Sequence, residues 1–190
     1  HAIRSAAPDL IVLTGDLQDR FRETPRDYVT TLCSALQDIA PTYYVTGNHE
    51  WALHGVPDLK ERLGQNGVTV LSNRFVTLER NGDTLILAGI DDPNGNADQK
   101  SPETLATELY AAHGDPFWML LAHRNDRFQE QYSLLGADLV LSGHAHGGQI
   151  IIPFLRQGVF APHRGFFPQY TEGVHEKGDT TMVVSRGLGN

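Results

Sequence analysis

The sequence predicts an α/β protein in which layered sheets are covered by helices. Three observations lead to this prediction: short β-branched apolar runs, helical patterns that alternate with them, and one hairpin signal. The apolar runs are nearly continuous, as is typical of strands buried on both faces. They occupy residues 10–15, 43–47, 68–72, 84–90, 118–123, 139–144 and 181–185.

Three helical patterns separate these strands. We expect Thr24 to cap the first helix and Pro25 to lie in its first turn. Its apolar positions repeat at helical spacing, at Tyr28, Leu32, Leu36 and Ile39. The second pattern covers residues 57–67 and ends on Gly67, a glycine typical of a helix C-terminus, and the third covers residues 101–114. Residues 80–83 read Arg-Asn-Gly-Asp and predict a tight hairpin turn.

Composition narrows the class of protein. The 190 residues are 40% hydrophobic and 20% charged, which fits one globular domain spanning residues 1–190. The net charge of −8 argues against nucleic acid as a partner. One cysteine, Cys33, excludes a disulfide framework and a thiolate metal site. No apolar run reaches about 18 residues. We expect the protein to lie in the cytoplasm or at the periphery of a membrane. The presence of a signal or membrane anchor further upstream is left open.

Polar residues of metal-ligand type follow four of the predicted strands. They are Asp16 after the first strand, Asn48 and His49 after the second, His123 after the fifth, and His144 and His146 after the sixth. In open α/β sheets, ligands bind at the carboxyl ends of the strands. An isolated His-x-His pair is more often a solvated turn, but four such strand ends together predict a shared site.

The residue types in this set favour metal chemistry. Carboxylate oxygen, amide oxygen and imidazole nitrogen suit Mn, Fe, Zn or Ni, and the absence of sulfur ligands disfavours a closed structural zinc site. Two such ions can clamp the attacking and leaving oxygens of a phosphoryl displacement, and the nucleophile is then water. We expect His49 to protonate the leaving oxygen or to stabilise charge on the phosphoryl group. The alternative is that His49 only orients a metal ligand.

Four segments resemble the ordered motifs of the calcineurin-like metallophosphoesterase superfamily. They are TGD at 14–16, GNHE at 47–50, AH at 122–123 and GHAHGGQ at 143–149. The end of the chain, SRGLGN, resembles a bacterial branch that includes membrane-associated and cell-envelope phosphohydrolases. The resemblance implies a four-layer α/β/β/α sandwich with two divalent metal ions at the strand ends. It implies that Asp16 bridges the ions, that Asn48, His123 and His144 hold one of them, that His146 binds the other, and that His49 faces the substrate.

The implied function is metal-dependent hydrolysis of a phosphomonoester or phosphodiester. The substrate is expected to be lipid-linked or nucleotide-like, with peripheral membrane association left open. Two departures from the family are visible: no Asp-x-His motif precedes Asp16, and the chain stops at Asn190, where the family usually continues. We therefore expect a sandwich truncated at both ends. The rival interpretation is a catalytically impaired scaffold that binds a protein partner.

Three further features lie near the predicted site. Arg124 follows a predicted ligand, and the sequence does not decide between binding a substrate phosphate and a solvated position. For Asp91 and Asp92, loop capping is favoured over a role in the site wall. Residues 151–170 are aromatic and apolar, which fits either a wall against a hydrophobic substrate or a loop packed on its own sheet.

Overall fold

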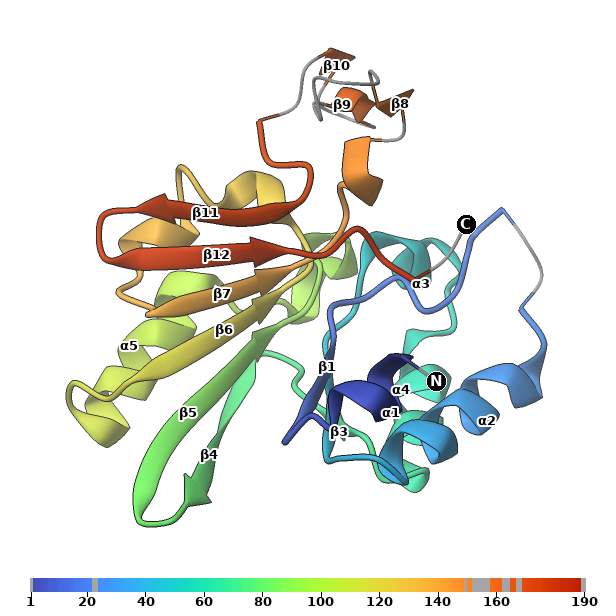
Figure 1. The fold of residues 1–190 in the computed structure, drawn as a ribbon, viewed down its shortest axis with the longest axis horizontal. Helices are drawn as coiled ribbons and strands as arrows, with labels where there is room; N and C mark the ends of the chain where they lie inside the picture. Colours follow the sequence, from blue (N-terminus) through green and yellow to red (C-terminus); the bar gives the residue numbers. More distant parts are fainter. Residues whose placement is uncertain are drawn as a thin grey trace.

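The computed structural model describes residues 2–21, 24–148, 150–151, 158–161, 165–166 and 169–188 (Figure 1). One sheet is entirely parallel and has the strand order β1-β2-β3. Its strands are β1 (Ile11–Leu13), β2 (Thr42–Tyr44) and β3 (Thr69–Val70).

The second sheet has six strands in the order β11-β12-β7-β6-β5-β4. Its four inner strands run parallel, whereas β11 and β4 pair antiparallel to their neighbours. The strands are β4 (Arg74–Arg80), β5 (Asp83–Ile90), β6 (Trp118–Ala122), β7 (Leu139–Ser142), β11 (Gly173–Lys177) and β12 (Thr180–Val184). A small antiparallel sheet joins β8 (Ile150–Ile151), β9 (Gly158–Ala161) and β10 (Gly165–Phe166).

Helices cover the outer faces of the two large sheets (Figure 1). They are α1 (Ala2–Ala6), α2 (Arg26–Gln37), α3 (Asn48–Ala52), α4 (Val56–Gln65) and α5 (Pro102–His113). On one side, Val29 of α2 and Leu63 of α4 pack with Tyr44 of β2. On the other side, Leu109 of α5 packs in a cluster with Trp118 of β6. The helices α2 and α4 therefore bury apolar side chains against the three-stranded sheet, and α5 does so against the six-stranded sheet.

A separate apolar cluster fills the space between the two sheets. Val45 and Leu71 follow strands of the three-stranded sheet, and Leu87 and Leu121 belong to the six-stranded sheet. All four side chains are fully buried in one cluster. The layers are thus helix, sheet, sheet and helix, and the predicted α/β sandwich is confirmed.

The strands and helices lie close to their predicted positions. Each predicted apolar run overlaps one observed strand, and α2, α4 and α5 match the three helical patterns. The hairpin joins β4 to β5 through Arg80 and Asp83, with positive φ angles of 54° at Asn81 and 91° at Gly82, as a type I′ turn requires. Gly67 follows α4 with a φ of 83°, as predicted for a terminal glycine.

Two local predictions on the first long helix were wrong. The first long helix begins at Arg26, and the capping position is Pro25 rather than Thr24. Tyr28 is 53% exposed, because the buried face of this helix carries Val29 and Cys33 instead. Asn48, which was predicted to follow the second strand, begins the short helix α3.

Candidate metal centre

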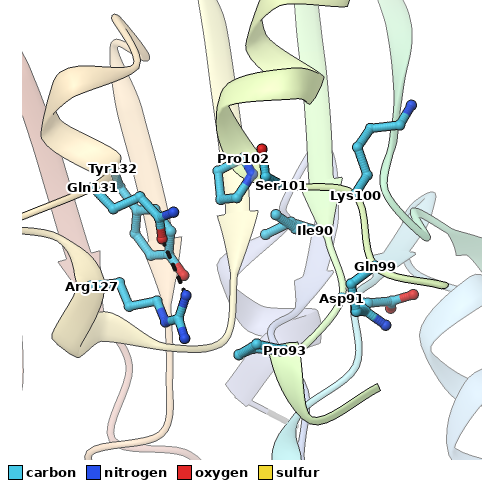
Figure 2. Close-up of a pocket in the computed structure, with 10 residues that line it drawn as sticks. All are labelled: Ile90, Asp91, Pro93, Gln99, Lys100, Ser101, Pro102, Arg127, Gln131 and Tyr132. Atoms are coloured by element: carbon cyan, nitrogen blue, oxygen red, sulfur yellow. Dashed lines mark hydrogen bonds between the residues drawn. The ribbon is translucent and has the colours of Figure 1, made fainter. Parts of the chain in front are cut away.

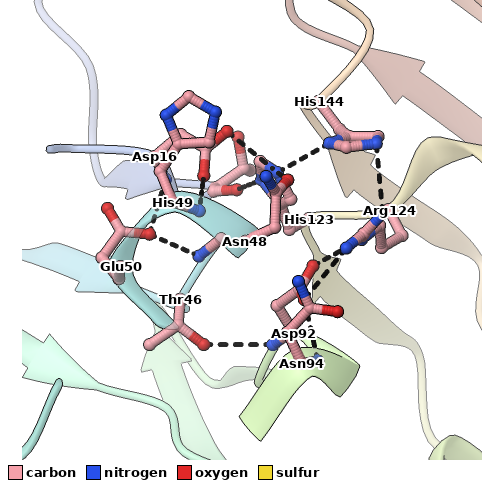
Figure 3. A network of polar contacts seen from close by, with 12 residues as sticks. Asp16, Thr46, Asn48, His49, Glu50, Asp92, Asn94, His123, Arg124 and His144 are labelled. Carbon is pink, nitrogen blue, oxygen red and sulfur yellow. Dashed lines mark hydrogen bonds and ion pairs between the residues drawn. The ribbon is translucent and has the colours of Figure 1, made fainter. Parts of the chain in front are cut away.

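Four predicted ligands meet where the two large sheets end. One ligand atom each of Asp16, His123 and His144 lies within 4.8 Å of the other two. Oδ1 of Asn48 lies 3.1 Å from Nε2 of His123 (Figure 3). Asp16 and Asn48 follow strands of the three-stranded sheet, whereas His123 and His144 follow β6 and β7 of the six-stranded sheet. The carboxyl ends of parallel strands from both sheets thus form one cluster, which we call the donor cluster.

The ring of His123 lies at the centre of the donor cluster. Its Nδ1 is 2.7 Å from the backbone carbonyl oxygen of Thr14, which can only accept a hydrogen bond. Nδ1 therefore carries the proton of the neutral ring, and Nε2 offers a lone pair. Around Nε2 lie Nδ1 of His144 at 3.1 Å, Oδ1 of Asn48 at 3.1 Å and Oδ2 of Asp16 at 3.2 Å. These donor atoms converge on a point that suits a cation.

The carboxylate of Asp16 supports the same conclusion. Its Oδ2 is buried and has no hydrogen-bond partner among the described residues. Burial alone would raise the pKa of Asp16, but His123, when it is protonated at Nε2 and so donates to Oδ2, and the backbone N–H of His49 lower that pKa to about 2. Asp16 is therefore ionised at neutral pH and holds an unsatisfied oxygen inside the cluster. An N/O site of this kind fits a divalent metal ion.

The two histidines of the cluster differ in their tendency to bind a proton. Burial lowers the pKa of His144 to about 3, and the positive charge of His123 when that ring is protonated, together with that of Arg124, acts in the same direction. Burial also lowers the pKa of His123, but the hydrogen bond and charge of Asp16 outweigh it and raise the pKa. His144 is thus neutral at physiological pH, as a metal-binding imidazole must be.

The backbone around the donor cluster has an unusual geometry. Asp16 and His144 have positive φ angles of 56° and 68°, a conformation that is uncommon outside glycine and often found at functional sites. The loops also approach very closely: a Cβ atom on Gly47 would lie 2.2 Å from Oδ1 of Asp16, and one on Gly15 would lie 2.5 Å from the backbone N of Gly47. These contacts explain the glycines that precede the predicted ligands.

Glu50 anchors the loop that carries Asp16. Its carboxylate is almost completely buried and accepts backbone N–H groups of Gly47 at 2.8 Å, Asp16 at 3.0 Å and Gln18 at 3.2 Å. Burial and the charge of Asp16 raise the pKa of Glu50, and these hydrogen bonds oppose that rise. Glu50 was not among the predicted site residues, although an acidic residue in the first turn of a helix is a recognisable sign of such an anchor.

His49 lies beside the cluster and not within it. Its backbone N–H donates to Oδ1 of Asp16 at 3.0 Å, whereas its ring turns towards the loop after β1. There Nδ1 accepts the backbone N–H of Arg20 at 3.4 Å and lies 3.5 Å from a carboxylate oxygen of Asp19. The ring of the exposed Phe21 lies perpendicular to the His49 ring at a centroid distance of 5.9 Å. Because Nδ1 accepts, the neutral ring carries its proton on Nε2.

The other histidines that the structure describes lie outside the donor cluster. His146 has an exposed side chain and begins the 3₁₀ turn His146–Gly148. His54 and His113 are exposed, and His175 is half-buried on β11. His163 lies outside the described residues, as do most residues of the apolar segment 151–170.

Asp92 and Arg124 form an ion pair next to the cluster. Nε of Arg124 lies 2.5 Å from Oδ2 of Asp92, and Nη2 lies 3.2 Å from Oδ1 (Figure 3). Oδ1 of Asp92 also accepts the backbone N–H of Asn94, as predicted for a loop cap. Arg124 is only 14% exposed, so it is not a solvated arginine. Asp91, by contrast, binds Thr46 and forms an ion pair with Lys60.

Comparison with known families gives a match over most of the chain. Residues 1–148 match the family model described as calcineurin-like phosphoesterase. This range contains all the donors of the cluster.

Curated relatives carry the same family name. The chain is 32% identical over 98% of its length to the uncharacterized metallophosphoesterase YkuE of Bacillus subtilis and covers 63% of that protein. It is 29% identical over its whole length to YkoQ of the same species, of which it covers 68%. A transmembrane protein with metallophosphoesterase domain from Bos taurus is 30% identical over 97% of the chain, which spans 42% of it. The chain therefore spans about two thirds or less of these relatives.

A solved structure supports the fold. The NAD nucleotidase of Haemophilus influenzae superposes with a TM-score of 0.60 over 94% of this chain and 36% of its own, at 17% sequence identity. At that identity the likeness concerns the fold alone. Among the described residues, no helix combines the length and the apolar character needed to cross a membrane.

Proposed function

The chain belongs to the calcineurin-like phosphoesterase family, and on this premise we propose that it hydrolyses phosphoester bonds with the help of a divalent metal ion held by the donor cluster. The observation that supports the proposal best is the convergence of Asp16, Asn48, His123 and His144 on one point. The buried, unsatisfied Oδ2 of Asp16 lies at that point.

A divalent ion, when bound there, would lower the pKa of a water molecule and offset negative charge on the phosphoryl oxygens. The other residues act through their own groups. In its doubly protonated form, with Nδ1 facing Asp19, His49 gives its Nε2 proton to the leaving oxygen and is left as a neutral imidazole, a role typically worth about 10²–10⁴-fold in rate. Glu50 and the backbone N–H of His49 hold Asp16 in place. The identity of the metal, among Mn, Fe, Zn and Ni, stays a prediction.

The proposal for a second ion has fewer donors to support it. Asp16 would bridge the two ions, and His146 would bind the second one. The side chain of His146 is exposed and lies outside the donor cluster. We therefore expect this chain to bind one ion firmly and a second ion more weakly. The choice between monoester and diester, and between a lipid-linked and a nucleotide-like substrate, also remains a prediction.

The rival proposal, a scaffold without catalysis, fits the site less well. Asp16 and His144 adopt uncommon backbone conformations, and a buried carboxylate is left unsatisfied. Such features cost stability of the order of 1–3 kcal/mol each and persist where function requires them. A scaffold needs neither feature.

The test is to replace His123 or His144 with alanine and to measure metal content and hydrolysis together. Each variant loses a metal donor, so we expect metal content to fall and hydrolysis of bis-p-nitrophenyl phosphate to fall by about 100-fold or more. The matched control is His113→Ala, which removes an exposed imidazole on α5 and should change neither quantity. Full metal occupancy in both cluster variants would contradict the assignment of these ligands.

A further inference from the structure

Arg124 presents one nitrogen to the donor cluster while its other two are held by Asp92. Nη1 lies 3.3 Å from Nε2 of His144, and Nε and Nη2 contact the two carboxylate oxygens of Asp92 (Figure 3). The Asp92 side chain is fully buried. The guanidinium is thus fixed in its plane, with a third N–H group directed at the site.

Asp92 is itself rigidly held. Its backbone N–H donates to Oγ1 of Thr46 at 3.0 Å, and its Oδ1 accepts the backbone N–H of Asn94 at 3.0 Å. The ion pair of Asp92 and Arg124 is therefore held in place by groups at the ends of β5 and β2. Such a buried ion pair is weak evidence for stabilisation on its own, because desolvation of the two charges offsets their attraction. Stabilisation therefore does not account for this ion pair, and its position next to the donor cluster indicates a functional role.

We propose that Arg124 binds a non-bridging phosphoryl oxygen of the substrate through Nη1, with Asp92 as its positioning residue. This inference rests on the proposed function and adds the residue that recognises the phosphoryl group. The contact of Nη1 with His144 is long and ends on a neutral imidazole. A phosphoryl oxygen carries negative charge and accepts a hydrogen bond from arginine about twice as strongly as a neutral group does. Nη1 therefore exchanges His144 for the substrate with little movement of the guanidinium.

The role depends on the shape of arginine more than on its charge. Because Asp92 already neutralises Arg124, the contribution to binding is a directed hydrogen bond. Lysine has one ammonium group and cannot hold both oxygens of Asp92 while it offers a further N–H in a fixed direction. Arg124→Lys should therefore fail to restore binding.

Arg127 provides a matched control three residues further along the chain. It lines a pocket of about 210 Å³ together with Gln131 and Tyr132 (Figure 2). None of the residues that line this pocket belongs to the donor cluster. Arg127→Gln removes the same charge from the same turn, so it reports any effect of charge alone.

The experiment measures inorganic phosphate binding by calorimetry on the manganese-loaded chain, with metal content determined for each variant. For Arg124→Gln we expect unchanged metal content and phosphate affinity weaker by about 10–100-fold, the usual effect of losing one hydrogen bond to a charged group. The KM for bis-p-nitrophenyl phosphate should rise with it. Asp92→Asn should show a smaller loss, Arg124→Lys a loss close to that of Arg124→Gln, and Arg127→Gln none.

Two other results separate the inference from the proposed function. If Arg124→Gln binds phosphate within about twofold of the unaltered chain and urea unfolding shows only lower stability, Arg124 has a structural role and the inference is wrong. Full rescue by lysine would also overturn it, since charge would then suffice. An unaltered chain that binds no metal would instead contradict the proposed function.

Discussion

At the level of single residues, His49 contributes to the site in two separable ways. Its backbone N–H holds Asp16, and its ring lies apart from the donor cluster against the loop after β1. The backbone contact does not depend on the side chain, so any residue at position 49 other than proline can make it. Replacement of the ring therefore tests catalysis without removing the support of Asp16.

We predict that His49→Ala keeps its metal and loses turnover. For substrates with an alkoxide leaving group, kcat should fall by about 10²–10⁴-fold, because the proton donor is absent. The loss should be smaller for a p-nitrophenyl ester, whose leaving group needs little protonation. The measurement is kcat for both classes of ester alongside metal analysis. An equal loss for both would favour charge stabilisation by His49, and loss of metal would favour the orienting role.

The candidate donors could be predicted from the sequence, whereas the long-range contacts of their supporting residues could not. Asp16, Asn48, His123 and His144 each follow a recognisable apolar strand, and parallel strands end at one edge. Glu50 and Asp92 act through backbone groups and side chains 30 or more positions away, at Asp16 and Arg124. Such contacts depend on how the two sheets pack against each other. The periodicity of the sequence carries no information about that packing.

At the level of elements, Thr46 connects three segments of the chain near the site. This fully buried residue follows β2, and its hydroxyl donates to Asp91 at the end of β5. The same oxygen accepts the indole N–H of Trp51 in α3 and the backbone N–H of Asp92. One hydroxyl thus joins the ends of strands from both large sheets to the helix that begins with Asn48.

We predict that Thr46→Val destabilises the fold by about 2–4 kcal/mol. Valine has nearly the same shape but leaves the N–H groups of Trp51 and Asp92 without an acceptor, and each such loss costs about 1–3 kcal/mol. Urea unfolding gives the free energy directly. The control is Thr77→Val on the exposed face of β4, which should change stability by less than about 0.5 kcal/mol. A cost below about 1 kcal/mol for Thr46→Val would mean that other groups take over its bonds.

Strands were predicted correctly where burial on both faces requires a continuous apolar sequence. The inner strands of the six-stranded sheet are apolar on both faces and were recognisable. β11 reads Gly-Val-His-Glu-Lys and is largely exposed at the sheet edge, so it carries no apolar pattern to detect. α3 is five residues long, shorter than the length at which helical periodicity becomes visible. Its start at Asn48 follows instead from the capping contact between Glu50 and Gly47.

At the level of the whole molecule, the donor cluster lies across the junction of the two sheets. Apolar packing of Val45 and Leu71 against Leu87 and Leu121 joins the sheets along their faces. The cluster joins them at their carboxyl ends, since it takes donors from both. An ion bound by the cluster would therefore link the two halves of the sandwich, and its binding energy would add to the stability of the fold.

We therefore predict that manganese raises the melting temperature of the chain and that chelation reverses the rise. At a free metal concentration of about 100 times Kd, binding contributes about 2.7 kcal/mol. For a domain of this size that corresponds to a shift of about 5–10 °C. Differential scanning calorimetry with and without EDTA measures the shift.

Hydrogen exchange should show added protection at both sets of strand ends, near Asp16 and Asn48 and near His123 and His144. In His123→Ala the shift should disappear, while His113→Ala should retain it. A shift of equal size in His123→Ala would place the stabilising ion elsewhere, because an ion at the cluster cannot bind with full affinity once its central imidazole is gone.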